Sequence, residues 1–282
     1  MTIARADSHL HLFEHGFVGR NGQSPIGDVP DISAYETLRR EHNIAAGLVV
    51  GYEPTGDAHY TGNNGYLRKL AGEHSWIHSV AYIETSARPD ISHIERTLAQ
   101  GHVGLAIYLA DVDSVLRFRS WPAEIWAMLN AHRAIVSLNI RPEPTAHLQP
   151  IVDALADCCI MVSHIGLPGP YGEAPTRAAA EERLSGLLAL SGQANVRVKL
   201  SGLYAVGAAT ATHPHPGAAP FLDAVLEKFG AYRCLWGSDF TPSLDWCRFE
   251  DTFRLPVLDQ LNSDEREAIV GGNLLSCISG RR

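Results

Sequence analysis

The sequence predicts an α/β protein, a single-domain (β/α)8 TIM barrel spanning residues 1–282, and three observations support this prediction. Eight short β-rich runs follow one another along the chain, and most are continuously apolar, as in strands buried on both faces. Stretches with helical spacing separate them, which implies parallel pairing through helical crossovers. The length of 282 residues suits one such barrel.

The eight predicted strands are spaced regularly, and the order of strand and helix is the same throughout. An open doubly wound sheet is the alternative, but no GxGxxG motif follows the first run. No linker or internal sequence repeat divides the chain. The runs are TIARADSH (2–9), AAGLVVG (45–51), IHSVAYI (77–83), GLAIYLA (104–110), AIVSLNI (134–140), CIMVSHIG (159–166), NVRVKLSG (195–202) and RCLWGSDF (233–240).

The intervening segments place apolar residues three and four apart, which is the period of a helix with one buried face. Ser263 is expected to cap the last helix, and the two glycines inside that helix weaken its continuity. The predicted helices cover residues 34–43, 63–74, 91–100, 122–133, 177–192, 217–230 and 263–278.

Composition narrows the class of partner. The net charge of -8, without clusters of Lys and Arg, argues against nucleic acid, because binding to phosphates needs such clusters. No run of about 18 apolar residues predicts a membrane span, and the five cysteines form no CxxC pair. We therefore expect a cytoplasmic protein with reduced thiols that acts on a small molecule, either as a monomer or as a homo-oligomer.

The stretch DSHLHLF (7–13) carries two histidines two residues apart at the end of the first run. In a strand this spacing points His9 and His11 to one face. His164 ends the sixth run and Asp239 ends the eighth. Because catalytic groups of a (β/α)8 barrel lie at the C-terminal ends of its strands, these four side chains are expected to meet in one catalytic site.

Other polar side chains at the same strand ends are candidates for substrate binding. Arginine recognises carboxylates through two parallel hydrogen bonds, so Arg141 is the first candidate for a carboxylate clamp. Arg117 and Arg119 are weaker candidates, and the loop after the second strand adds His59 and Tyr60. His213 and His215 are expected in a surface loop. The predicted substrate-binding residues are Arg141, Tyr52, Lys199 and Tyr108, with Ser201 and Tyr204 in a position similar to that of Lys199.

Together, the motifs DSHLHLF, VSHIGLPG, VKLSGLY and LWGSDFTP resemble the amidohydrolase superfamily over nearly the whole chain. They are most similar to the amidohydrolase-related branch, which holds 2-pyrone-4,6-dicarboxylate lactonase, L-fuconolactonase, sulfomuconolactone hydrolase and some non-oxidative decarboxylases. The resemblance implies a lactone hydrolase with Asp239 as general base, and His9, His11 and His164 as metal ligands or contacts to the substrate carbonyl.

The resemblance also bears on metal content. Members rich in metal use a Lys or Glu at the fourth strand and a His at the fifth, whereas Tyr108 and Asn139 stand near those places here. A binuclear site is therefore not expected. One Zn²⁺ or Mn²⁺ on His9, His11 and Asp239 fits the usual three-ligand catalytic arrangement. Of the two forms, we expect hydrolysis without any metal in preference to hydrolysis with this single ion.

Two other functions stay open at this stage. A metal-dependent decarboxylase on the same scaffold would normally keep the fifth-strand His that is missing here. A catalytically silent barrel that only binds a ligand would have no reason to keep the three histidines and the aspartate together.

Overall fold

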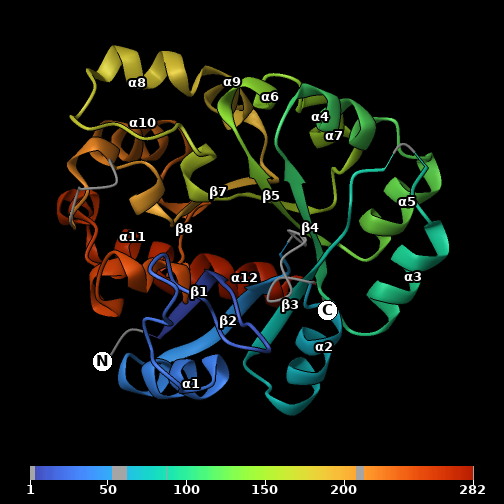
Figure 1. Ribbon diagram of the computed structural model, residues 1–282. Helices are drawn as coiled ribbons and strands as arrows, with labels where there is room; N and C mark the ends of the chain where they lie inside the picture. Colours follow the sequence, from blue (N-terminus) through green and yellow to red (C-terminus); the bar gives the residue numbers. More distant parts are fainter. Residues whose placement is uncertain (1–3, 53–61, 87, 208–212, 282) are drawn as a thin grey trace.

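The computed structural model of the protein describes residues 4–52, 62–86, 88–207 and 213–281 and has the predicted barrel (Figure 1). Eight strands pair in parallel in the order β1-β2-β3-β4-β5-β6-β7-β8. The strands are β1 (Arg5–Leu10), β2 (Ile44–Val50), β3 (Ile77–Tyr82), β4 (Gly104–Leu109), β5 (Ile135–Ile140), β6 (Cys159–Val162), β7 (Val196–Leu200) and β8 (Cys234–Trp236).

The barrel closes between the C-terminal end of β1 and the segment just after β8. Leu10 and Phe240 form a parallel bridge. The N–H of His11 donates to the Phe240 carbonyl at 2.5 Å, and the N–H of Asp239 donates to the His9 carbonyl at 2.7 Å. Closure therefore places the backbone of the two histidines directly beside that of Asp239.

Helices connect the strands as predicted, with more segments than the periodicity indicated. The predicted helix 177–192 is divided into α8, α9 and a 3-10 turn. Three helices that were not predicted follow β4 (α4) and β5 (α6 and α7). The helices are α1 (Asp31–Glu41), α2 (Asn64–Glu73), α3 (Ile91–Ala99), α4 (Val112–Arg119), α5 (Ala123–Ala131), α6 (Pro142–Thr145), α7 (Gln149–Ala154), α8 (Arg177–Arg183), α9 (Ser185–Ala189), α10 (Ala219–Phe229), α11 (Ser263–Glu267) and α12 (Asn273–Ser279).

The last helical segment departs from the prediction in two ways. Asn262, not Ser263, caps α11: its side chain accepts the N–H of Glu265. A π-helical segment (Ala268–Gly272) joins α11 to α12. A Cβ at Gly271 would lie 2.4 Å from the Ala4 carbonyl oxygen, so this glycine lets the helix approach the start of β1.

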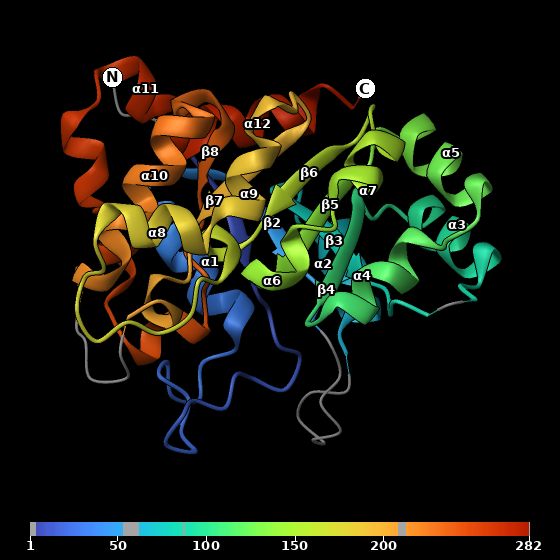
Figure 2. The ribbon, with the colours of Figure 1, turned by 90° about the horizontal axis from the view of Figure 1, so that it is seen from above.

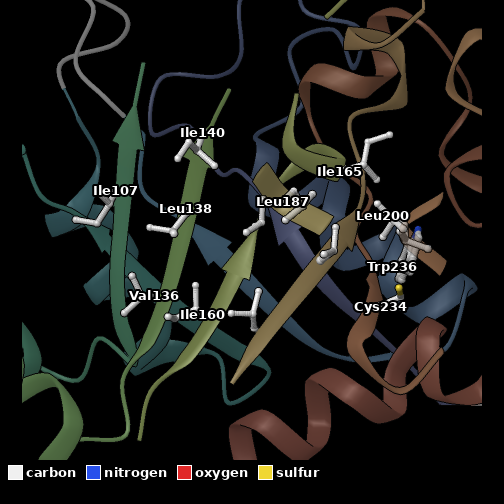
Figure 3. Packing of buried hydrophobic residues seen from close by; sticks show 14 of the residues in the cluster. Ile107, Val136, Leu138, Ile140, Ile160, Ile165, Leu187, Leu200, Cys234 and Trp236 are labelled. Carbon is white, nitrogen blue, oxygen red and sulfur yellow. The ribbon is translucent and has the colours of Figure 1, made fainter. Parts of the chain in front are cut away.

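Alternation along the strands divides the apolar core into two clusters. The outer cluster packs the barrel against its helices and includes Leu138, Leu200 and Trp236 (Figure 3). The inner cluster fills the N-terminal half of the barrel with residues such as Met161 and Leu235, and Leu274 of α12 covers it. Polar residues are thereby left to the C-terminal half of the barrel interior.

Different segments of the chain cover the two ends of the barrel. In Figure 2 the blue segment after β1 lies at the C-terminal ends of the strands, and α11 and α12 (red) lie at the opposite end. No helix among the described residues is long and apolar enough to cross a membrane.

One buried histidine outside the barrel mouth gives a prediction about acid stability. His102 is buried and its Nδ1 lies 2.9 Å from the Ser79 hydroxyl. Burial, with a smaller contribution from Arg68, lowers the pKa of His102 from 6.5 to about 4. Between these values the unfolded chain binds a proton that the folded chain does not, so stability falls as the pH falls through this window, by up to about 3 kcal/mol.

We therefore expect His102→Gln to lose less stability than the wild type between pH 6.5 and pH 4. Urea unfolding at several pH values measures this difference. Parallel curves for the two proteins across the window would show that His102 does not titrate as argued.

Candidate active site

The first strand carries an irregularity that turns its histidines into the barrel. Its register with β2 shifts between Arg5 and Ala6 and again between Asp7 and Leu10, where three steps along β1 face two steps along β2. Ala6 belongs to the inner cluster, and strict alternation would then turn His9 outward. The extra residue restores an inward direction for both His9 and His11, as bulges beside active sites commonly do.

The four predicted catalytic side chains meet at the C-terminal end of the barrel. Nε2 of His9 lies 3.2 Å from Nε2 of His11, and each of these nitrogens lies 3.6 Å from Oδ1 of Asp239. Nδ1 of His164 lies 3.9 Å from Oδ2 of the same carboxylate. All four residues are at least nine-tenths buried. Their charges and hydrogen bonds consequently act on one another with little screening by water.

Two of these residues have unusual backbone conformations. His164 has φ 53° and Asp239 has φ 54°, both in the left-handed region that side chains with a Cβ rarely adopt. Both follow the ends of their strands, where the chain turns away from the barrel. Strain of this kind persists where the surroundings fix the residue, and it concentrates at functional sites.

Hydrogen bonds to the backbone set the proton position on His11. Its Nδ1 lies 2.9 Å from the Val50 carbonyl oxygen, which can only accept. The proton of the neutral ring is therefore on Nδ1, and Nε2 presents a lone pair to the centre of the site. Burial lowers the pKa of His11, and that of His9 much further, so both rings are neutral near pH 7.

Lys199 contacts His9 from inside the barrel. Its Nζ lies 3.2 Å from Nδ1 of His9 and donates to the Ser137 hydroxyl at 2.7 Å. The side chain is fully buried, so this predicted substrate-binding residue is placed beneath the histidines and not at the mouth. Burial lowers the pKa of Lys199 to about 7. In its charged form the ammonium can only donate, which places the His9 proton on Nε2.

Two further hydroxyl groups contact Asp239 and His164. The Tyr204 hydroxyl donates to Oδ2 of Asp239 at 2.7 Å, and the Ser201 hydroxyl lies 3.1 Å from Nδ1 of His164. Burial and the neighbouring carboxylate of Asp239 raise the pKa of Tyr204 far above its usual range. Tyr204 therefore stays protonated as a donor, and leaves Oδ1 of Asp239 facing His9 and His11.

Asp7 is the main residue of the site that sequence reasoning missed. Its carboxylate is completely buried and accepts from the N–H of His9, the Tyr35 hydroxyl, and both the N–H and the hydroxyl of Ser238. Burial raises the pKa of Asp7 to about 6, although these donors oppose the rise. The sequence signal that could have identified Asp7 was a carboxylate inside an apolar strand, because such a group needs several hydrogen-bond partners when it is buried.

Three other candidates for substrate binding surround the same end of the barrel. Tyr52 follows β2 and its ring stacks on Phe13 at 4.9 Å between centroids. Tyr108, near the end of β4, donates its hydroxyl to the Gly51 carbonyl at 3.3 Å. Arg141 directly follows β5 and is exposed. His59 and Tyr60 lie outside the described residues.

The weaker candidates take structural positions. Nε of Arg117 donates to the Thr85 carbonyl at 2.9 Å, which anchors α4. His215 is buried, so the expectation of a surface position is wrong for this residue: it lines a cavity together with Tyr204 and Ser238. Among the described residues with potential metal ligands, His9, His164 and Asp239 form a group of three buried donors within mutual reach.

The donor atoms fit one divalent ion. Ligands at 2.0 to 2.1 Å in a tetrahedron lie about 3.3 Å apart, close to the spacings among His9, His11 and Asp239. His11 already presents a lone pair to the centre, and His9 would do so with its proton on Nδ1, where the Ser163 hydroxyl lies 3.3 Å away. His9 and Asp239 belong to either possible set, with His11 or His164 as the third ligand.

The comparison with solved structures gives the same fold over the full length. An amidohydrolase from Burkholderia multivorans with bound zinc is 20% identical, with a TM-score of 0.73 and coverage of 98% of this chain and 99% of that chain. A protein from Acinetobacter baumannii, named "probable 2-pyrone-4,6-dicarboxylic acid hydrolase" and crystallised with citric acid, is 17% identical, with a TM-score of 0.70 and coverage of 98% and 99%.

The family comparison extends this result to the sequence. No curated protein matches the chain. The sequence pattern of the family described as amidohydrolase, however, matches residues 74–273, which is most of the chain and includes His164 and Asp239. The chain belongs to the amidohydrolase family of hydrolases.

Proposed function

We propose that the protein is a lactonase that opens a small carboxylated lactone or sugar lactone by attack of water. The observation that carries the proposal is the position of Asp239, which has one oxygen held by Tyr204 and the other facing two neutral histidines. This arrangement provides a base for water beside a donor, Nε2 of His9, for a carbonyl oxygen. An activated ester suits such a site better than an amide, because its leaving group needs less assistance.

In the proposed reaction Oδ1 of Asp239 takes a proton from water as the water oxygen attacks the lactone carbonyl carbon. The carbonyl oxygen gains negative charge, and the Nε2 proton of His9 is available to stabilise it when Lys199 donates to Nδ1. Tyr204 holds the carboxylate in place throughout. The ring C–O bond then breaks, and the proton on Asp239 returns to the leaving oxygen.

A divalent ion on His9, Asp239 and a third histidine would polarise the carbonyl and lower the pKa of a bound water. The steps above use the chain's own groups in the form without that ion. Lys199 favours the form without metal, because its ammonium lies 3.2 Å from His9 and opposes a second positive charge there.

The substrate class follows from charge and from the relatives. Arg141 is exposed at the mouth and suits a substrate carboxylate. The A. baumannii neighbour, named for a pyrone dicarboxylate and crystallised with citric acid, supports an acidic substrate. We further propose that the protein works in the cytoplasm, as a monomer or homo-oligomer without a nucleic-acid or membrane partner. A non-oxidative decarboxylase or a silent ligand-binding barrel is the alternative.

A panel of 2-pyrone-4,6-dicarboxylate and sugar lactones, followed by release of acid, tests the proposal. Turnover of at least one lactone supports it. Release of CO₂ from an aromatic carboxylate, without acid release from lactones, would identify a decarboxylase. Binding detected by a thermal shift without any turnover would identify a silent barrel.

Asp239→Asn should lower kcat by about 10² to 10⁴, because the amide cannot take the proton from water. The amide oxygen can still accept from Tyr204, so the fold should be kept. Asp245→Asn is the matched control: this carboxylate lies in the turn after β8 and accepts the N–H of Arg20. Near-normal turnover by the Asp239→Asn variant would show that Asp239 is not the general base.

Arg141→Ala should raise KM for dicarboxylate lactones about tenfold or more, while kcat changes little, because the lost contact binds ground state and transition state alike. Neutral sugar lactones provide the internal control and should keep their KM. An equal change for acidic and neutral substrates would mean that Arg141 does not bind a carboxylate.

Zinc should bind with at most one ion per chain, and Lys199→Met should bind it several-fold more tightly, because the substitution removes the opposing ammonium. Titration calorimetry and elemental analysis measure both values without an assay of activity. We expect the wild type to stay active after removal of metal with a chelator. Two ions per chain, or weaker zinc binding by Lys199→Met, would contradict this account of the site.

A further inference from the structure

Two cysteines meet at the end of the barrel opposite the active site. Cys159 is the first residue of β6 and Cys277 lies on α12, the helix that crosses this end (Figure 2). Their sulfur atoms are 3.3 Å apart although 118 residues separate them in the chain. Both thiols are free, and both residues are partly exposed.

The surroundings give the two sulfurs different roles. The Cys159 thiol donates to the Cys277 sulfur, so Cys277 is the acceptor of the pair. Nη1 of Arg197 lies 3.5 Å from the Cys159 sulfur. Nε of Arg197 is buried and has no hydrogen-bond partner among the described residues. The positive charge of Arg197 favours a negative charge on this pair of sulfur atoms.

The pKa values agree with this assignment. The hydrogen bond from Cys159, with help from Arg197, lowers the pKa of Cys277, while the same hydrogen bond raises that of Cys159 far above its usual range. The other thiols behave differently: burial raises the pKa of Cys158 and of Cys234 to about 12. Only the thiolate reacts readily with oxidants, so Cys277 is the reactive member.

We propose that Cys159 and Cys277 are a redox modification site, which a hydroperoxide converts to a disulfide that fastens α12 to β6. This proposal is independent of the substrate of the active site. It rests on the contact between the two sulfurs and on the cation beside them.

The chemistry balances in two steps. The Cys277 thiolate attacks one oxygen of the peroxide: an S–O bond forms, the O–O bond breaks, and after protonation the products are a sulfenic acid and water. The Cys159 sulfur then attacks the sulfenic sulfur: the S–S bond forms, the S–O bond breaks, and the hydroxide leaves as water with the proton of Cys159. Two electrons pass from the sulfurs to the peroxide, and a thiol reductant reverses the change.

The disulfide should stabilise the fold and leave the active site unchanged. It would close a loop of about 120 residues, which restricts the unfolded chain. The Tm should therefore rise by about 3 °C or more after oxidation and return after reduction. Because the pair lies at the far end of the barrel from Asp239, the ligand-binding groups should not move.

The test treats the full-length protein with a small excess of hydrogen peroxide, blocks the remaining thiols and maps peptides without reduction. We expect a cross-linked peptide pair that contains Cys159 and Cys277 and has lost two hydrogens. Cys158→Ser is the matched control, because Cys158 is adjacent to Cys159 in sequence. This variant should still form the cross-link between Cys159 and Cys277. Cys159→Ser should stop at a sulfenic acid on Cys277, which a dimedone label detects.

The wild-type peptide map decides the matter even if a variant fails to fold. Peroxide treatment that leaves all five thiols free, overoxidises Cys277 without a cross-link, or links Cys158 instead would overturn the proposal.

Discussion

The buried carboxylate of Asp7 is the interaction on which the arrangement of the site depends. One oxygen accepts the backbone N–H groups of His9 and Ser238, and the other accepts the hydroxyls of Ser238 and Tyr35. It thereby joins β1 to the segment after β8 and to α1 with a single group. A buried carboxylate without such partners would cost several kcal/mol, so the position of each donor is held firmly. His9 lies two residues after Asp7, and Asp239 lies directly after Ser238, so both catalytic candidates are close to this anchor in the sequence.

From that anchor, the charges of the site follow an ordered pattern. Asp7 accepts the backbone N–H of His9, Asp239 faces the neutral rings of His9 and His11, and Lys199 places a buried amino group against His9. Each partner fixes the next proton: the Val50 carbonyl sets the tautomer of His11, Lys199 acts on His9, and Tyr204 occupies one oxygen of Asp239. The groups that face a substrate are thus oriented before it binds, which is the condition for electrostatic catalysis.

The sequence was informative where local patterns decide structure. Continuously apolar runs with polar ends located the strands and placed His9, His11, His164 and Asp239 at one mouth. It was uninformative where the outcome depends on three-dimensional neighbours. Lys199 sits at a strand end like Arg141, but the direction of its side chain depends on alternation inside a closed barrel, which leaves it fully buried. His215 lies between two prolines, a pattern typical of a surface loop, yet it is buried and lines a cavity with residues that follow β7 and β8.

The two ends of the barrel have different roles: the N-terminal end contributes mainly to stability, and the C-terminal end holds the candidate catalytic groups. At the C-terminal end, His164 and Asp239 adopt left-handed backbone conformations that an isolated chain would leave, so the rest of the fold must hold them. At the N-terminal end, the apolar inner cluster and the close approach of Gly271 to Ala4 seal the barrel base with α12. Because one sheet connects both ends, the free energy gained from packing at the base keeps the strained conformations at the mouth populated. Contacts made by α12 therefore stabilise the fold that holds Asp239, without setting the positions of the groups around it.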